Sequence, residues 1–294
     1  MLKVEQAAAQ QLGRRLQQLL WKKMSPKKMA DHPSAQGFEY VIAYVLFLRA
    51  ERTFSSVRTL ARLRMVDDAF SLVRTLVEKV INAEYILLSG TETALDYIQY
   101  HSFREWRDFE EFQKTNPEVA PNYTAEFRKL LQEAHNRAKT KTMPDGSRRH
   151  RFGRGNDWID MGLSKRAEAV DEAIRKKFSM KTFKSTQVLY HMTYKQGAAY
   201  LHGMWVSLAR SLETKRGDSK EDADGMCEVE VGIRIKDKDP RVAYEALNSA
   251  NLAALYMILF LGRVFGTKDD LDWATRFKEP YLENQRRARK PPES

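Results

Sequence analysis

The sequence predicts an all-α protein, a single multi-helix bundle with at most a short β-hairpin or edge strand near residues 226–236. Three observations predict this class. Only 14 Gly and 9 Pro interrupt 294 residues, which favours long helices over many short strands. Apolar residues recur at helical spacing in most segments, and a hydrophobic content of 43% is enough for one sizeable core. We find no internal repeat and no interdomain linker, so we expect one domain over residues 1–294.

The central helix is expected over residues 67–88, DDAFSLVRTLVEKVINAEYILL. Asp67 and Asp68 are favourable at a helix start, and Ser89-Gly90 is a stop signal. Apolar side chains share one broad face of this helix and polar side chains share the other. Glu84 breaks the division, because it points to the apolar side, where an unpaired carboxylate is costly.

Two helices are expected before the central one. The first spans residues 2–24 and belongs to an N-terminal unit of helix and linker over residues 1–30, with Ser25-Pro26 ending the helix. The second spans about 36–65; its first half is strongly apolar, and its second half carries a basic stripe of Arg49, Arg52, Arg58, Arg62 and Arg64.

The remaining segments follow in order. In the helix after the central one an aromatic residue recurs about every three positions, a pattern more typical of core packing than of a base-stacking surface. CEVEVGIRI, residues 227–235, alternates like a short strand, either in a hairpin or as an edge pairing across a dimer. Residues 286–294 are expected to form a flexible basic tail. We expect the remaining helices over residues 91–114, 124–138, 164–178 (capped by Ser164), 183–212, 240–264 and 269–287.

The charge balance indicates a polyanionic partner. Fifty Lys and Arg against 39 Asp and Glu give a net charge of +11. The single cysteine fits a reducing compartment, and no secretory signal opens the chain, so we expect a cytoplasmic protein. The most apolar stretch, Leu252–Leu261, is too short to span a bilayer, so no membrane partner is expected.

The familiar enzyme signatures are absent. The sequence has no GxxxxGK[ST], no GxGxxG after a strand, no GxSxG and no HExxH. This counts against an ATPase, a dehydrogenase, a common esterase and a zinc protease. One cysteine also excludes a multi-cysteine metal site, so we expect no metal and no cofactor.

Residues 139–157, KTKTMPDGSRRHRFGRGND, are the most loop-like part of the chain. A flexible Arg-Gly segment can contact phosphates and become ordered on binding. A solvated surface loop explains the composition equally well. The residues that would hold phosphates are Arg148, Arg149, Arg151 and Arg154.

Histidine-bearing patterns give two candidate sites. His191, Lys195 and His202 have spacings of four and seven, which place them on one flank of the late helix, where they suit proton transfer or phosphate contact. The other candidate is Arg128 with His135, an Arg-x6-His pair that suits a metal-free ribonuclease. A solvated helix flank and a chance spacing are the respective alternatives.

A third arrangement lies on the central helix, where Arg74, Glu78 and Asn82 stand at i, i+4 and i+8. These residues form ordinary helix-surface pairs if they face solvent. If later helices cover them, they form a buried polar network in which Arg74 pairs with Glu78 and meets the histidines of the late helix.

The segment SLVRTLVE, residues 71–78, followed downstream by Tyr194 and the run Tyr200-Leu201-His202-Gly203, resembles a widespread bacterial family known as domain of unknown function 5677. The resemblance covers residues 36–265. It implies Arg74, Glu78 and His202 as site residues. The family often has Ser four residues before this His, where this chain has Ala198. Its helical, defence-associated character is similar to the HEPN ribonucleases, although their compact Arg-polar-x-x-x-His signature is missing here.

The leading functional hypothesis is therefore RNA binding, with a metal-independent, HEPN-like ribonuclease activity in antiviral defence or a toxin system. Arg74, Glu78 and His202 would be catalytic, and Lys195, His191, Tyr194 and the arginines of 148–154 would bind substrate. The alternative is a non-catalytic helical protein that binds a protein partner or a small molecule, and whether the chain is an enzyme stays open at this point. Small residues on the late helix are also compatible with a homodimer.

Overall fold

The computed structural model describes residues 2–115, 117, 125–142, 148–150, 158–159, 161–181, 184–195, 212–216, 220–221, 227–228, 231–235 and 240–289. Helices dominate these residues, and their strands occur in two-stranded antiparallel pairs, so the all-α class is confirmed. The helical elements are α1 (Leu2–Gln17), the π-helical turn η1 (Gln18–Lys23), η2 (Pro33–Ala35), α2 (Phe38–Leu63), α3 (Val66–Ser89), α4 (Thr91–Thr115), α5 (Ala125–Lys139), α6 (Leu163–Lys177), α7 (Ser185–Leu189), the π-helical turn η3 (Tyr190–Tyr194), α10 (Pro240–Val264) and α11 (Lys268–Arg289).

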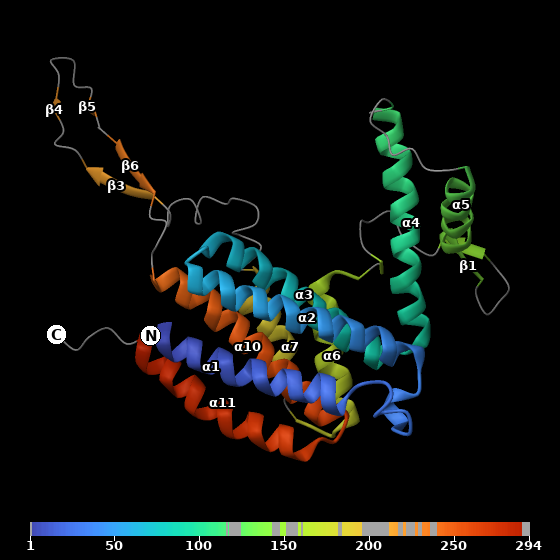
Figure 1. Cartoon of the computed structure of the whole chain (residues 1–294), viewed down its shortest axis with the longest axis horizontal. Coiled ribbons are helices and arrows are strands. Elements are labelled where there is room, and N and C mark those ends of the chain that lie inside the picture. Colours follow the sequence, from blue (N-terminus) through green and yellow to red (C-terminus); the bar gives the residue numbers. More distant parts are fainter. Residues whose placement is uncertain are drawn as a thin grey trace.

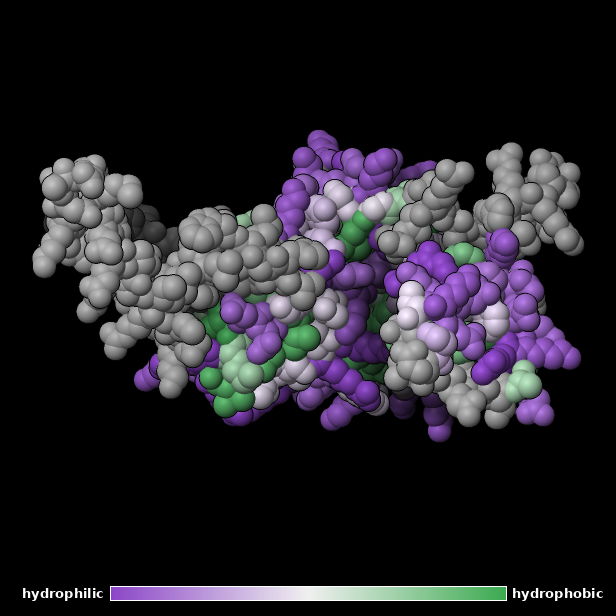
Figure 2. Space-filling model, turned by 90° about the horizontal axis from the view of Figure 1, so that it is seen from above, coloured by the Kyte–Doolittle hydropathy of each residue, from purple (hydrophilic) through white to green (hydrophobic). Residues whose placement is uncertain are grey.

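The body of the molecule is a bundle in which α2 lies along α3, and α10 contacts α1, α2, α3 and α11 (Figure 1). α4 projects from one end of this body with α5 beside it, and the strands β3–β6 project from the other end. Large apolar side chains such as Phe47, Phe54, Phe70 and Leu76 fill the space between the central helices. Hydrophilic residues cover most of the described part of the face seen in Figure 2.

The central helix α3 has the role that its sequence predicts. Its apolar face, from Phe70 to Ile86, is buried, and the helix ends at Gly90, whose φ of 92° favours glycine. Glu84 is 1% exposed, so the carboxylate on the apolar side is fully enclosed. The partner that this burial requires comes from another helix, as described below.

The helix α10 is more apolar than the Leu252–Leu261 stretch alone suggests. Residues Ala243–Val264 are long and apolar enough to cross a membrane by length and composition, with a mean hydropathy of 1.3. However, 83% of the apolar window is buried inside the molecule. We therefore interpret α10 as a second core helix, packed against α1, α2, α3 and α11.

Buried polar contacts attach α1 to the C-terminal helices. The Glu5 carboxylate is fully buried and accepts hydrogen bonds from Asn251 Nδ2 at 2.7 Å and from Tyr281 Oη at 2.8 Å. At the other end of α1, Arg15 and Lys23 each lie 2.6 Å from the buried carboxylate of Asp270. The N-terminal helix is thus an integral layer of the bundle.

Strands occur in two regions. As expected for residues 227–235, β5 (Cys227–Glu228) and β6 (Val231–Ile235) are strands, and they pair within the chain with β4 (Lys220–Glu221) and β3 (Leu212–Arg216). The prediction of a loop over 139–157 is wrong at two places, because β1 (Thr140–Thr142) pairs with β2 (Arg148–His150). The turn signal Pro144-Asp145-Gly146 between these strands was the available indication of a hairpin.

Three predicted boundaries are corrected. α6 begins after Gly162 without a side-chain cap, so Ser164 lies inside the helix. The late helix does not reach Leu212, which begins strand β3. The C-terminal helix α11 continues to Arg289, so residues 286–289 of the expected flexible tail are helical.

Candidate functional site

Arg74 contacts the late helical segment, as the sequence suggested. Its Nε donates a hydrogen bond to Tyr194 Oη at 3.2 Å, and its guanidinium carbon lies 5.3 Å from the centre of the same ring. Both side chains are half-buried. Two of the predicted site residues, separated by 120 positions, are therefore in direct contact.

Tyr194 belongs to a row of two stacked aromatic rings with a cation at each end. The rings of Tyr190 and Tyr194 stack with their centroids 5.3 Å apart and an interplanar angle of 18°. Lys195 Nζ lies 5.8 Å from the centre of the Tyr190 ring. The ring of the exposed His191 is nearly perpendicular to the Tyr190 ring, with the two ring centroids 5.2 Å apart. We call Arg74, Tyr194, Tyr190 and Lys195 the cation–tyrosine row.

The backbone beneath this row is the π-helical turn η3, which continues α7. Its hydrogen bonds run from i to i+5, and such turns occur often at functional sites. The wider turn also changes the α-helical spacing on which the expected alignment of His191 and Lys195 depended. His202 lies outside the described residues.

Glu78 stands one turn from Arg74 but, among the described residues, forms no ion pair with it. The prediction of an Arg74–Glu78 pair is therefore wrong. The charge of Glu78 instead acts on Lys79 and Tyr97, raising the pKa of each. Burial lowers the pKa of the Lys79 ammonium and Arg49 lowers it further, whereas Glu78 raises it. Lys79 Nζ donates to Thr53 Oγ1 of α2 at 2.8 Å, which fixes this side of α3.

The third member of the polar stripe, Asn82, is covered by α6, as the network hypothesis required. Arg166 Nη1 donates to Asn82 Oδ1 at 2.7 Å, and both residues are buried. The Arg166 guanidinium also lies 5.2 Å from the centre of the Trp158 ring. The ring of Tyr97 packs against the same tryptophan, with the two ring centroids 5.1 Å apart. No signal in the sequence singled out Arg166, which is one of several charged residues in the segment LSKRAEAVDEAIRKK.

A second buried network holds the start of α7, the helix that η3 continues. Thr186 Oγ1 donates to Glu84 at 3.1 Å. The carboxylate of Asp171 accepts the backbone N–H groups of Thr186 at 2.9 Å and Gln187 at 3.0 Å, and so satisfies the start of α7. Burial raises the pKa of Glu84 well above its ordinary value, and Asp171 raises it further. The apolar-face position of Glu84 was the sequence signal for this network, but Asp171 and Thr186 carried none.

The predicted phosphate-binding arginines are placed only in part. Arg148 and Arg149 belong to β2, opposite Thr142 and Lys141 of β1. Arg151 and Arg154 lie outside the described residues. The structure therefore describes only the backbone pairing of the first two.

The Arg128–His135 candidate is part of the packing between α4 and α5. His135 stacks on Phe103 with centroids 4.6 Å apart, and its Nδ1 lies 3.2 Å from the Phe103 carbonyl oxygen. Arg128 lies 5.9 Å from the centre of the Phe109 ring. These contacts account for both residues structurally. Within the described part of the chain, no group of three or more His, Cys, Asp or Glu side chains could hold a metal ion.

One comparison with known proteins gives a match. The model of the "Family of unknown function (DUF5677)" matches residues 40–220, a range that includes Arg74, Glu78, η3 and His202. Residues 36–39 and 221–265, which the sequence resemblance included, lie outside this match. No curated protein and no solved structure matches the chain.

Proposed function

The chain belongs to the DUF5677 family of unknown function, and from this premise we propose that it binds single-stranded RNA through the cation–tyrosine row. The row itself carries the proposal. Proteins that bind single strands combine cations for the phosphates with aromatic rings for the bases. Arg74 of α3, Tyr194 and Tyr190 of η3, and Lys195 bring these two chemistries together as two stacked rings with a cation at each end. The net charge of +11 supports the same partner.

We extend the proposal to a metal-independent endoribonuclease. In this reaction a base removes the proton of a ribose 2′-hydroxyl, the resulting oxygen attacks the adjacent phosphorus, and the 5′-oxygen leaves with a proton from an acid. His202 would serve as acid or base. Arg74 would neutralise the charge that develops on the phosphate oxygens, and Glu78 would orient the site. The resemblance to HEPN ribonucleases supports a role in cytoplasmic antiviral defence or in a toxin system.

Cleavage of a mixed RNA in the presence of a metal chelator tests the catalytic part. We expect cleavage by the wild type and its loss, by roughly a hundredfold or more, in Arg74→Ala and His202→Ala, as is typical when a charge-stabilising or acid–base group is removed. Arg276→Ala, on the exposed side of α11, is the matched control and should cleave normally. Equal cleavage by all four proteins would refute the assignment.

In the non-catalytic alternative, the Arg74–Tyr194 contact only packs η3 against α3. Tyr194→Phe separates the two readings, because it removes the hydrogen bond at 3.2 Å and keeps the ring. We expect a loss of about 0.5–1.5 kcal/mol in the free energy of unfolding, the usual contribution of one such bond. RNA affinity should change little in this variant but fall strongly in Tyr194→Ala. If RNA affinity is the same in both variants, the tyrosine ring does not bind RNA.

A further inference from the structure

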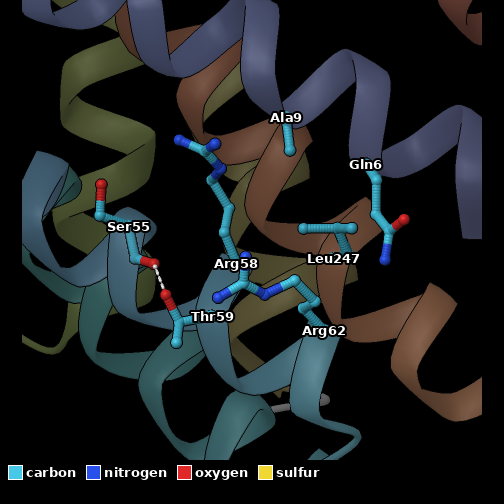
Figure 3. Close-up of a pocket in the computed structure, with 7 residues that line it drawn as sticks. All are labelled: Gln6, Ala9, Ser55, Arg58, Thr59, Arg62 and Leu247. Carbon is cyan, nitrogen blue, oxygen red and sulfur yellow. Dashed lines mark hydrogen bonds between the residues drawn. The ribbon is translucent and has the colours of Figure 1, made fainter.

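A second cationic region lies on the opposite side of α2 from Lys79 and its contacts, in the layer formed with α1 and α10. A pocket of about 300 Å³ opens there and is lined by Gln6, Ala9, Ser55, Arg58, Thr59, Arg62 and Leu247 (Figure 3). Gln6 and Ala9 come from α1, the four residues from Ser55 to Arg62 come from α2, and Leu247 comes from α10. Residues 1–39 and 221–294 lie outside the family match, so two of these three walls are not part of the matched region.

The charges around this pocket are unbalanced. Arg14, Arg62 and Glu51 are the charged groups close enough to alter the pKa of Arg58, so three guanidinium groups share one carboxylate. Burial lowers the pKa of Arg58, and Arg14 and Arg62 lower it further, against the effect of Glu51. The Glu51 carboxylate also accepts a hydrogen bond from Gln17 Nε2 at 3.2 Å. An arginine stays protonated under these conditions, so the cluster keeps an excess of positive charge.

The backbone of α1 is adapted to this cluster at Gly13. Figure 3 shows the Arg58 side chain extending from α2 toward α1. A Cβ atom added at Gly13 would lie 2.5 Å from Nη1 of Arg58, closer than Cβ atoms approach other heavy atoms in proteins. Glycine is unfavourable inside a helix, but here it leaves the space that the guanidinium group occupies.

Hydroxyl groups line the same wall. Ser55 Oγ donates to Glu51 only at 3.5 Å, the limit of a hydrogen bond, so its proton can turn to a ligand. Thr59 Oγ1 donates to the Ser55 carbonyl oxygen at 3.2 Å, and Arg62 lies one turn along the helix from Arg58. Guanidinium groups beside hydroxyl groups match the planar, bidentate recognition of phosphate oxygens.

We propose that this pocket binds a phosphate group of a phosphorylated ligand, held by Arg58 and Arg62 with Arg14 completing the positive field. A volume of about 300 Å³ is at the small end of ligand sites, which fits a di- or triphosphate better than a whole nucleotide. The phosphate can come from a free polyphosphate or nucleotide, or from an RNA backbone. This site is separate from the cation–tyrosine row and does not require RNA cleavage.

The test is calorimetric titration of the full chain at low salt with sodium tripolyphosphate and, separately, with an RNA oligonucleotide that carries no terminal phosphate. We expect tripolyphosphate to bind the wild type and to bind Arg62→Ala roughly tenfold or more weakly, because hydrogen bonds to charged groups contribute that much. Arg52→Ala, an exposed arginine of the same helix outside the pocket, is the charge-matched control and should stay within about twofold of the wild type.

Gly13→Ala provides a second variant that removes no charge. The added methyl group should displace the Arg58 guanidinium and weaken tripolyphosphate binding by roughly tenfold, while the melting temperature stays the same or rises because alanine favours the helix. If the oligonucleotide binds with the same variant pattern, the phosphate source is the RNA backbone. Arg74→Ala and Tyr194→Ala should leave tripolyphosphate binding unchanged, which separates this site from the proposed RNA function. Absence of binding by both probes, or equal weakening in Arg62→Ala and Arg52→Ala, overturns the proposal.

Discussion

At the scale of single residues, the contact between Arg74 and Tyr194 holds the cation and the ring on which the proposed function depends. The hydrogen bond at 3.2 Å uses the Nε of the guanidinium group and leaves its two terminal nitrogens for other acceptors. The ring of Tyr194 is held parallel to that of Tyr190 before any ligand arrives. Because the ring and the cation are already held in place, less side-chain entropy is lost when a ligand binds.

Glu84 gives a prediction at the same scale. Its pKa is raised in the folded protein because the carboxyl group is buried and lies near Asp171. The carboxyl group therefore binds a proton more tightly in the folded state than in the unfolded state, where its pKa is near the ordinary value of 4.5. The free energy of unfolding should fall as pH rises above that value and level off above the folded-state pKa. In Glu84→Gln, which cannot ionise, this fall should be smaller.

Urea unfolding between pH 5 and pH 8 measures the effect. The glutamine can still accept the Thr186 hydrogen bond, so the variant should be the more stable protein at the alkaline end. Two parallel curves would show that Glu84 does not titrate in this range.

At the scale of elements, the sequence was informative about long helices and much less so about η3. The apolar stripe of α3 and the Gly90 stop fix that helix locally, so its bounds could be predicted closely. The π-helical turn at Tyr190–Tyr194 depends on contacts with α3 and on Asp171, which caps α7 from another helix. No local pattern encodes such contacts. The sequence therefore singled out Arg74, Tyr194 and Lys195 but neither Tyr190 nor the geometry of the row.

The attachment of α1 gives the second prediction. Asn251→Ala removes a donor at 2.7 Å from the fully buried Glu5 carboxylate and leaves that charge with fewer partners. We expect the free energy of unfolding to fall by about 2 kcal/mol, since a buried carboxylate that loses one of its hydrogen-bond donors is costly. Chemical denaturation measures this, with the exposed Gln10→Ala of α1 as a control that should change stability by less than about 0.5 kcal/mol. A loss no larger than the control's would mean that the network does not hold α1.

At the scale of the whole molecule, the bundle presents two cationic regions on different helix pairs. The cation–tyrosine row joins α3 to η3, within the family match, whereas the arginine pocket joins α2 to α1 and α10. The sequence predicted the basic stripe on α2 but not the pocket, because residues from three helices far apart in the sequence form its walls. It also singled out Arg74 and Tyr194, which the structure places in direct contact.

The most direct measurement of the central claim is the affinity for a fluorescent single-stranded RNA, measured by anisotropy over a range of salt concentrations. If the cation–tyrosine row binds RNA, the logarithm of the affinity should fall linearly with the logarithm of salt concentration. Tyr194→Ala should weaken binding by about 1–3 kcal/mol with little change in that slope, since it removes stacking and no charge. Arg74→Ala should also reduce the slope by about one unit. Binding that is absent at low salt, or equally strong in wild type and Tyr194→Ala, would contradict the account.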